Sequence, residues 1–333
     1  MDWTKGFSAS YRMDIVDPET WRDVEEKSIM KGSIDKTEDG LRESADIECR
    51  DFETNAEKWI RVWLYARQDG SAAREALFTG IVSSPSREIS GTREVTPLEC
   101  YSVLKPAKDV LLQRGWYAPS GANGAELAKS LLSVTPAPIY ITGESRDLQK
   151  AIVAEDGESR LSMADKILAA VGMRLRISGM GEVEICEKAR ESIATFGAGE
   201  DVIEPSIKVE KDWFDCPNVF RAIADDVAAV ARDDALDSPL STVNRGREVW
   251  AEETNCEMND GESVAEYAIR RLRELQQAGE KISYDRRFDP RVNVGDLIAL
   301  HYPRQGLQGI YLVKSQTIEI GLGARVSEEV ASA

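Results

Sequence analysis

Two stretches near opposite ends of the chain share one pattern of alternating apolar and polar positions. The first, Trp59–Gln68, leads through a small-residue loop into Leu77–Val82. The second, Val294–Gln305, leads through a glycine-containing turn into Ile310–Val313. Each consists of a strand, a polar Arg-Gln exit, a turn and a second strand with an aromatic residue, which predicts a β-hairpin. Amphipathic hairpins resemble one another, so the pattern alone leaves open whether the chain holds two related small barrels.

The first hundred residues predict an antiparallel β unit. Ser8–Val16 and Ala45–Arg50 also alternate with a period of two. In the strand Trp59–Tyr65, one face is aliphatic and would lie against a core. The residues of the opposite face are Trp59, Arg61, Trp63 and Tyr65. A broad aromatic face could stack on bases or sugars, but it more often covers a second layer of the same fold or a subunit interface.

The middle of the chain predicts a compact α+β unit. Leucines at helical spacing in Ala125–Leu132 and an apolar stripe after Ser162 indicate two helices, and Gly172 is placed to end the second. Met173–Ile177 and Glu182–Cys186 then alternate around a glycine turn. They predict a hairpin whose arginines and glutamates face one another.

The last third predicts a linker, a hairpin and a helix before the closing strands. Residues from about 187 to 204 are polar and contain glycine, which favours a linker. Asn218–Ile223 and Val227–Arg232 predict a hairpin. Ser263 and Glu266 form a capping-box pattern, because each side chain can satisfy the backbone amide of the other, and this pattern predicts the start of a helix.

These elements predict a β-rich α+β fold in three domains. Residues 1–105 would form a first β-barrel domain and residues 106–200 an inserted α+β domain with its linker. Residues 201–333 would form a second β-barrel domain with a packed helix. The chain of 333 residues, 42% of them hydrophobic, is long and apolar enough for domains with real cores.

Composition removes several classes of protein. No run of about 18 apolar residues indicates a membrane span, and Met1–Lys5 lacks the basic stretch and apolar core of a secretory signal. We therefore expect synthesis and assembly in a cytoplasm, without membrane insertion. No Cys-x-x-Cys pair occurs, so buried free thiols are expected rather than a zinc site or disulfides, and no cofactor is expected. The cysteines are Cys49, Cys100, Cys186, Cys216 and Cys256.

The formal net charge of −17 argues against a nucleic-acid-binding surface. Such a surface needs clustered Lys and Arg that displace counterions from phosphates. Acidic charge serves solubility in many proteins. An acidic wall would also let DNA slide past without sticking to it.

Acidic pairs raise the alternative of a glycoside hydrolase, which needs two carboxylates about 5 to 10 Å apart across a cleft. With 59 acidic residues, pairs such as Glu252 with Glu253 and Asp233 with Asp234 arise by chance. Adjacent carboxylates on a strand point to opposite faces, so they are poor catalytic pairs. Asp233, Asp234 and Asp237 could hold a cation only loosely, because the calcium-loop pattern is missing.

The sequence lacks the motifs of common enzymes. It contains no Gly-x-Ser-x-Gly, no His-Glu-x-x-His and no phosphate-binding loop. His301 is the only histidine and lies on a predicted strand, where partial burial is its ordinary role. The aromatic face of Trp59–Tyr65 leaves a carbohydrate-binding module as a further alternative.

The parts of the chain follow a recognisable order. They are a β unit with Asp17-Pro18 and Trp21, a helix-glycine-hairpin unit around 162–185, the Asn218-Val219 hairpin, the capped helix at Ser263, and the closing Asp289–Asp296 segment with Gly309–Ser315. This order resembles the baseplate-hub, or tail-hub, proteins of tailed bacteriophages and related injection machines. The resemblance covers most of the chain and rests on the order of parts, because each closing motif is common in barrels generally.

The resemblance implies a homotrimeric ring in which each subunit supplies two tube-like antiparallel β-barrel domains flanking a smaller α+β domain. Three copies would present six similar modules to a hexameric tail tube protein. The ring would hold a threefold spike or tail-tip protein, with a tape-measure protein as a further candidate partner. DNA would pass through the lumen without specific binding, and the protein would reside in the virion tail.

A closed ring interface of this kind uses strand edges and barrel faces rather than one pocket. No catalytic residue is therefore expected. Within the same resemblance, the alternatives are a tail-associated cell-wall hydrolase and a carbohydrate-binding tail-tip module. The candidate interface residues are Trp59, Arg61, Trp63, Tyr65, Tyr302, Arg304 and Tyr311.

Overall fold

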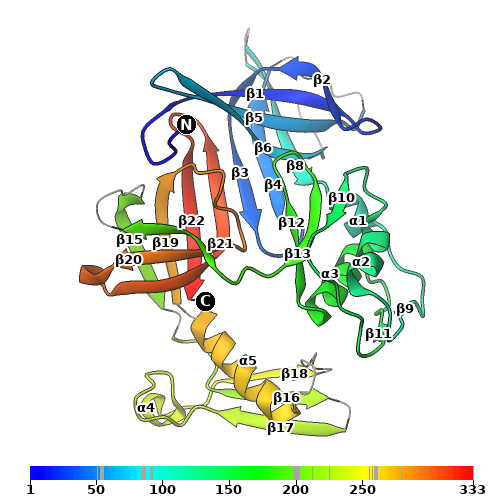
Figure 1. The fold of residues 1–333 in the computed structure, drawn as a ribbon, viewed down its shortest axis with the longest axis vertical. Helices are drawn as coiled ribbons and strands as arrows, with labels where there is room; N and C mark the ends of the chain where they lie inside the picture. Colours follow the sequence, from blue (N-terminus) through cyan, green and yellow to red (C-terminus); the bar gives the residue numbers. More distant parts are fainter. Residues whose placement is uncertain are drawn as a thin grey trace.

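The computed structural model describes residues 1–332 apart from 51, 53–55, 84–87, 91–92, 198–202, 212, 225, 255, 257, 259–261 and 279. These residues form one large sheet of 14 strands, three small sheets and five α-helices. Figure 1 shows the large sheet as the body, an α+β unit on one side of it, and a smaller unit below. The predicted β-rich α+β class is confirmed, whereas closure of the sheet into two barrels stays a prediction.

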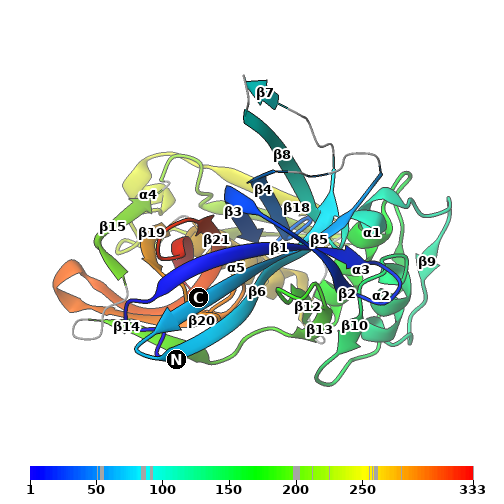
Figure 2. The ribbon, with the colours of Figure 1, turned by 90° about the horizontal axis from the view of Figure 1, so that it is seen from above.

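The N-terminal third supplies one half of the large sheet. Its strands alternate between buried and exposed positions, as the period of two predicted. Figure 2 shows the hairpin of β7 and β8 projecting from this half. The strands are β1 (Ser8–Asp17), β2 (Arg22–Lys27), β3 (Ile29–Thr37), β4 (Glu43–Cys49), β5 (Trp59–Gln68), β6 (Ser71–Val82), β7 (Glu88–Ser90) and β8 (Arg93–Ser102).

The C-terminal part supplies the other half. Both hairpins predicted from the repeated pattern exist, since β5 pairs with β6 and β20 pairs with β21, each in antiparallel fashion. The segment expected as a linker contains a strand, β14, which pairs in parallel with β20. The elements are β14 (Ser192–Gly197), β15 (Ile203–Lys211), β19 (Glu280–Arg287), β20 (Leu297–Tyr302), a short 3-10 helix (Pro303–Gln305), β21 (Leu307–Ile320) and β22 (Arg325–Ser332).

The two halves repeat one order of strand pairing. The first half runs β1-β5-β6-β8-β4-β3, and the second runs β14-β20-β21-β22-β19-β15. Matched strands also occur in the same order along the chain, which supports the internal repeat suggested by the hairpins. One pair differs: β1 is antiparallel to β5, while β14 is parallel to β20.

The long strand β21 joins the two halves. Its first part pairs with β20, and its second part pairs with β3, from Ser315 opposite Thr37 to Ile320 opposite Gly32. The halves therefore share one continuous set of backbone hydrogen bonds. Gly32 is required at this joint, because a Cβ there would lie 2.4 Å from the carbonyl oxygen of Asp46.

The inserted α+β unit packs two capped helices on small sheets. The side chain of Asn123 accepts a hydrogen bond from the Glu126 amide, and that of Ser159 accepts one from the Ser162 amide, so each starts a helix. Its elements are α1 (Lys105–Asp109), β9 (Tyr117–Ala118), α2 (Gly124–Leu132), β10 (Ile139–Ile141), β11 (Ile152–Val153), α3 (Arg160–Ala170), β12 (Met173–Ile177) and β13 (Val183–Glu187).

The lower unit is a three-stranded sheet with one face covered by a helix. The predicted capping box is confirmed, because Ser263 and Glu266 each accept a hydrogen bond from the other's amide. The chain enters and leaves this unit between β15 and β19, two strands of the large sheet. The unit contains β16 (Val219–Ala224), β17 (Val227–Arg232), α4 (Thr242–Arg245), β18 (Trp250–Thr254) and α5 (Val264–Ala278). Among the described residues, no helix has the length and apolar character needed to cross a bilayer.

Candidate functional site

Arg61, predicted on the aromatic face of β5, is 1% exposed. Its guanidinium donates to Asp23 Oδ1 at 2.6 Å, to Thr79 Oγ1 at 2.9 Å and to the carbonyl of Met180 at 3.0 Å. Burial lowers the pKa of Arg61, and the nearby Asp23 carboxylate opposes that shift. The arginine therefore lies inside the protomer and fixes other elements to β5.

The aromatic residues of the same strand are also covered by their own chain. Trp59 is buried and packs against Trp21, with ring centroids 5.6 Å apart. Trp63 is buried, donates from Nε1 to Asp23 at 3.0 Å, and carries the guanidinium of Arg74 over its ring at 3.5 Å. The second-layer interpretation therefore applies to Trp59, Arg61 and Trp63, which offer no open surface, while Tyr65 is half-buried.

The turn between β12 and β13 is the element that covers this face. The Met180 carbonyl accepts hydrogen bonds from Trp21 Nε1 at 2.8 Å and from Arg61, and the Gly179 carbonyl accepts one from Thr79 at 2.8 Å. Gly179 approaches β6 so closely that a Cβ would lie 1.7 Å from the carbonyl oxygen of Ala76. The glycine turn noted in the sequence is thus a docking element of the inserted unit.

Arg174 on β12 attaches the inserted unit to the second half of the sheet. It donates to Asp296 Oδ1 at 3.1 Å and to the Val294 carbonyl at 3.3 Å. Gly295 lies between these two acceptors with a φ of 81°, and a Cβ there would lie 1.7 Å from Arg174 Nη1. The Gly-Asp pair of the closing motif therefore receives this arginine. A further ion pair, from Arg42 to Asp165 at 2.6 Å, ties α3 to the first half.

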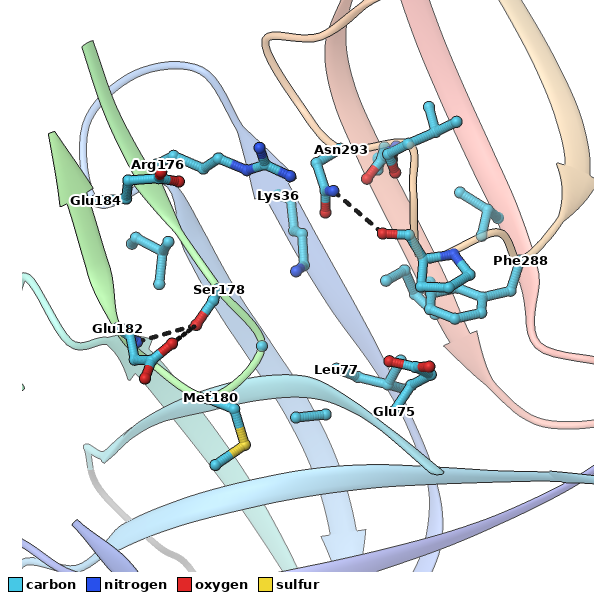
Figure 3. Close-up of a pocket in the computed structure, with 18 of the residues that line it drawn as sticks. Lys36, Glu75, Leu77, Arg176, Ser178, Met180, Glu182, Glu184, Phe288 and Asn293 are labelled. Atoms are coloured by element: carbon cyan, nitrogen blue, oxygen red, sulfur yellow. Dashed lines mark hydrogen bonds between the residues drawn. The ribbon is translucent and has the colours of Figure 1, made fainter. Parts of the chain in front are cut away.

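A cavity of about 410 Å³ lies where the inserted unit and both halves of the sheet meet. Its wall carries Leu77, Phe288 and Ile318 among apolar residues, and Glu75 and Arg176 among charged ones. Figure 3 shows Arg176 and Glu182 on the β12–β13 hairpin, across the cavity from Phe288 and Asn293. Burial raises the pKa of Glu75.

The candidate interface residues of the second hairpin do not share one environment. Tyr302 is buried in the core of the second half, and Tyr311 packs partly buried against the same core. Arg304 is exposed on the short 3-10 helix, and His301 is exposed on β20. Only Arg304 among the candidates on this hairpin therefore presents a fully exposed side chain.

The acidic pairs considered for catalysis have structural partners. Glu252 forms an ion pair with Arg221, while Glu253 accepts a hydrogen bond from Tyr267 at 2.5 Å on the helix-covered side. This arrangement confirms that adjacent carboxylates on a strand diverge. Asp233 accepts hydrogen bonds from Ser238 in its own loop and from Gln276 on α5, so its carboxylate is engaged within the lower unit.

Some residues that organise the structure were not identified from sequence. Asp23, which holds both Arg61 and Trp63, lies on a short charged strand with no distinctive spacing. Arg174 was expected to face a glutamate across the β12–β13 hairpin, but the residue opposite it is Cys186, and its guanidinium reaches out of the hairpin. Its partner Asp296 is 122 residues away, however, and no local pattern links the two.

No family model matches the sequence, and no curated protein matches it. Three similar solved structures cover almost all of the chain. A tail protein from Neisseria meningitidis matches with a TM-score of 0.71 and 13% identity over 97% of this chain and 96% of that one. A tail protein of prophage MuSo2 from Shewanella oneidensis matches with a TM-score of 0.70 and 12% identity over 97% and 98%. A prophage tail protein from Listeria monocytogenes matches with a TM-score of 0.58 and 10% identity over 97% and 94%.

The chain has the fold of these phage tail proteins. At identities of 10 to 13%, the likeness establishes the fold and leaves the role of the chain to its own residues. The near-complete coverage of both chains means that the inserted unit and the lower unit belong to the shared fold as well. The likeness to phage tail proteins expected from the order of parts in the sequence is therefore confirmed at the level of the fold.

Proposed function

We propose that this protein is a structural hub of a phage tail or baseplate. Three copies form a ring that joins a hexameric tail tube to a threefold spike or tail-tip protein. DNA passes through the lumen of the ring without specific binding. The protein acts in the virion tail, after synthesis and assembly in the host cytoplasm.

The repeated strand order within one chain carries this proposal. Each protomer holds two halves with the same pairing order, so three protomers would present six similar half-sheets. Six repeats match a sixfold tube, and three chains match a threefold spike. A trimer of a chain with an internal repeat could thus bind a sixfold partner on one side and a threefold partner on the other. Tail proteins share the fold that contains this repeat.

The fixed position of the inserted unit supports the same role. Arg61, Arg42 and Arg174 attach this unit to both halves of the sheet. Each of these contacts restricts motion of the inserted unit relative to the large sheet. A subunit of a closed ring needs such rigidity, because its two contact surfaces must keep a fixed relative position. The net charge of −17 is consistent with a wall that repels DNA.

The alternatives receive less support from the described residues. A carbohydrate-binding module needs exposed aromatic rings, but Trp59 and Trp63 are buried within their own chain. A hydrolase needs two carboxylates on one cleft, but Glu252 and Glu253 lie on opposite faces of β18 and are paired there.

The proposal is tested by the mass of the purified chain, alone and mixed with the tube protein of the same phage. A hub gives three chain masses, or a ring seen by electron microscopy at the end of assembled tubes. A chain that stays monomeric and leaves tubes bare contradicts the proposal. Clearing of purified cell walls by the chain alone would favour the hydrolase instead.

A further inference from the structure

Two loops at one end of the lower unit expose large apolar side chains. Together with the exposed Val243 of α4, these side chains form what we name the α4 patch: Trp213, Phe214, Leu236 and Val243. Phe214 is 73% exposed and Leu236 is 80% exposed. Single exposed apolar residues are ordinary, but four such side chains on two neighbouring loops and α4 form a surface of the kind that marks protein contacts.

Arginine side chains hold the first loop in place. Arg245 donates to the carbonyls of Trp213, Phe214 and Cys216, and Arg247 donates to the Phe214 carbonyl at 2.7 Å. The guanidinium of Arg247 also lies over the Phe214 ring, 4.6 Å from its centroid. These bonds order the backbone that carries two exposed aromatic residues. The conformational entropy of this backbone is therefore lost on folding and not on binding.

Asn244 holds the second loop. Its side-chain amide donates to the carbonyls of Leu236 at 2.9 Å and Ser238 at 2.8 Å. The short helix α4 therefore carries the residues that fix both loops, since Asn244 and Arg245 are its last two residues. Pre-ordered tryptophan and phenylalanine beside an arginine are typical of the residues that dominate binding energy at protein interfaces.

We name the 410 Å³ cavity between the inserted unit and the two halves of the sheet the junction cavity. Its lining is complementary in chemistry to the α4 patch. Two of its cations are already neutralised, because Lys36 pairs with Glu43 and Arg286 pairs with Glu328. Glu75 has no cation partner within the described part of the chain, and its half-buried carboxylate faces the cavity. Arg176 is the third cation of the lining, against the carboxylates of Glu75, Glu182 and Glu184, so the site combines an apolar wall with an excess of negative charge.

The wall of the junction cavity and the α4 patch carry complementary groups. Leu77, Phe288 and Ile318 would receive an aromatic ring, and Glu75 would receive a guanidinium. Phe214 with Arg247 stacked on it supplies both groups together. In Figures 1 and 2, α4 lies away from β6 and β12, whose residues line the cavity. The patch of one copy would therefore meet the cavity of another.

We propose that the α4 patch of one copy docks into the junction cavity of the next copy. The contact joins two different surfaces, so it is heterologous, and repetition around a rotation axis closes it into a ring. The inference rests on the proposed hub and names the residues through which its copies associate.

Sedimentation equilibrium of the full chain tests the patch. The double variant Trp213→Ser with Phe214→Ser should weaken self-association at least about tenfold, as expected for loss of central aromatic contacts. Trp250→Ser is the matched control, because Trp250 has the same 52% exposure as Trp213 in the same unit but lies outside the patch. The control should associate like the wild type, and thermal unfolding confirms that each variant is folded.

The cavity side has its own pair of variants. Glu75→Gln should weaken association about threefold or more, because it removes the charge opposed to Arg247. Glu319→Gln changes an exposed glutamate of the large sheet outside the cavity and should have no effect. Oxidation of the variant Trp213→Cys with Ser178→Cys should link copies through a disulfide that neither single variant forms.

The outcomes separate this inference from the hub proposal. A wild-type trimer with unchanged association in the patch variant and in Glu75→Gln overturns the inference and leaves the hub standing. A wild-type chain that neither self-associates nor binds tubes overturns both. Loss of association in the patch variant and in Glu75→Gln, with both controls intact, supports the docking as stated.

Discussion

The Arg61 guanidinium on β5 donates to the carbonyl of Met180, a residue 119 positions later in the chain. This bond, together with those from Trp21 and Thr79, fixes the β12–β13 turn over the aromatic face of β5. The face is therefore an internal joint between the inserted unit and the first half of the sheet.

Replacing Arg61 tests this joint. Arg61→Ala should lower the free energy of unfolding by about 2–4 kcal/mol, because it leaves a partly buried Asp23 carboxylate without its main cation. Arg67→Ala, near the exposed end of the same strand, should change it by less than about 0.5 kcal/mol. Urea denaturation followed by tryptophan fluorescence measures both values. Equal effects of the two variants would mean that Arg61 does not hold the joint.

A pair of glycine variants tests the Arg174 contact. Gly295 and Gly306 both have positive φ, so an alanine at either position costs about 1–2 kcal/mol in backbone strain. A Cβ at Gly295 would also displace the Arg174 guanidinium, whereas a Cβ at Gly306 meets nothing within 4 Å. Gly295→Ala should therefore lose about 1–2 kcal/mol more than Gly306→Ala in denaturant unfolding. Matching losses would show that the Arg174 contact adds no stability.

The capping box of α5 predicts an effect of pH. Hydrogen bonds from the Ser263 amide and hydroxyl lower the pKa of Glu266 below its ordinary value of 4.5. A lowered pKa of an acid gives stability that is present above the unfolded value and is lost as the pH falls through the folded value. The stability difference between wild type and Glu266→Gln should thus be seen at about pH 6 and shrink below about pH 4. A difference that stays constant over this range would contradict the capping role of the carboxylate.

Thiol labelling tests the predicted reduced cysteines. Cys186 is half-buried, while the other cysteines are buried, and burial raises the pKa of Cys100 and Cys186. Cys186 should react first with a thiol reagent in the native protein, and all five should react in urea, as followed by mass spectrometry. Rapid native labelling of Cys49 or Cys100 would show that the core of the first half opens.

Sequence pattern predicted the local elements well. The hairpins of Trp59–Val82 and Val294–Val313, the α5 capping box and the β12–β13 hairpin all depend on neighbours within a few residues. Alternation and capping report such neighbours directly, because they arise from backbone geometry. The internal repeat, suggested by two hairpins, is supported by the pairing order of six strands in each half.

Features that depend on distant residues were not predicted. The sequence left open whether a second layer of the same chain or a subunit covers Trp59, Arg61 and Trp63, because the covering turn lies more than a hundred residues away. β14 was expected within a linker because its strand character depends on pairing with β20. Alternation shows that a strand has two faces, but the layer that covers each face is decided by the rest of the fold.

The shared strand β21 has a mechanical consequence for the molecule. Its second part pairs with β3 across the boundary between the two halves, with hydrogen bonds perpendicular to the strands. A pull along the strands would load these bonds in parallel, so they would have to break together rather than one after another. The joint between the two halves should therefore resist a pull along the strands, and the halves should move as one body under such a load.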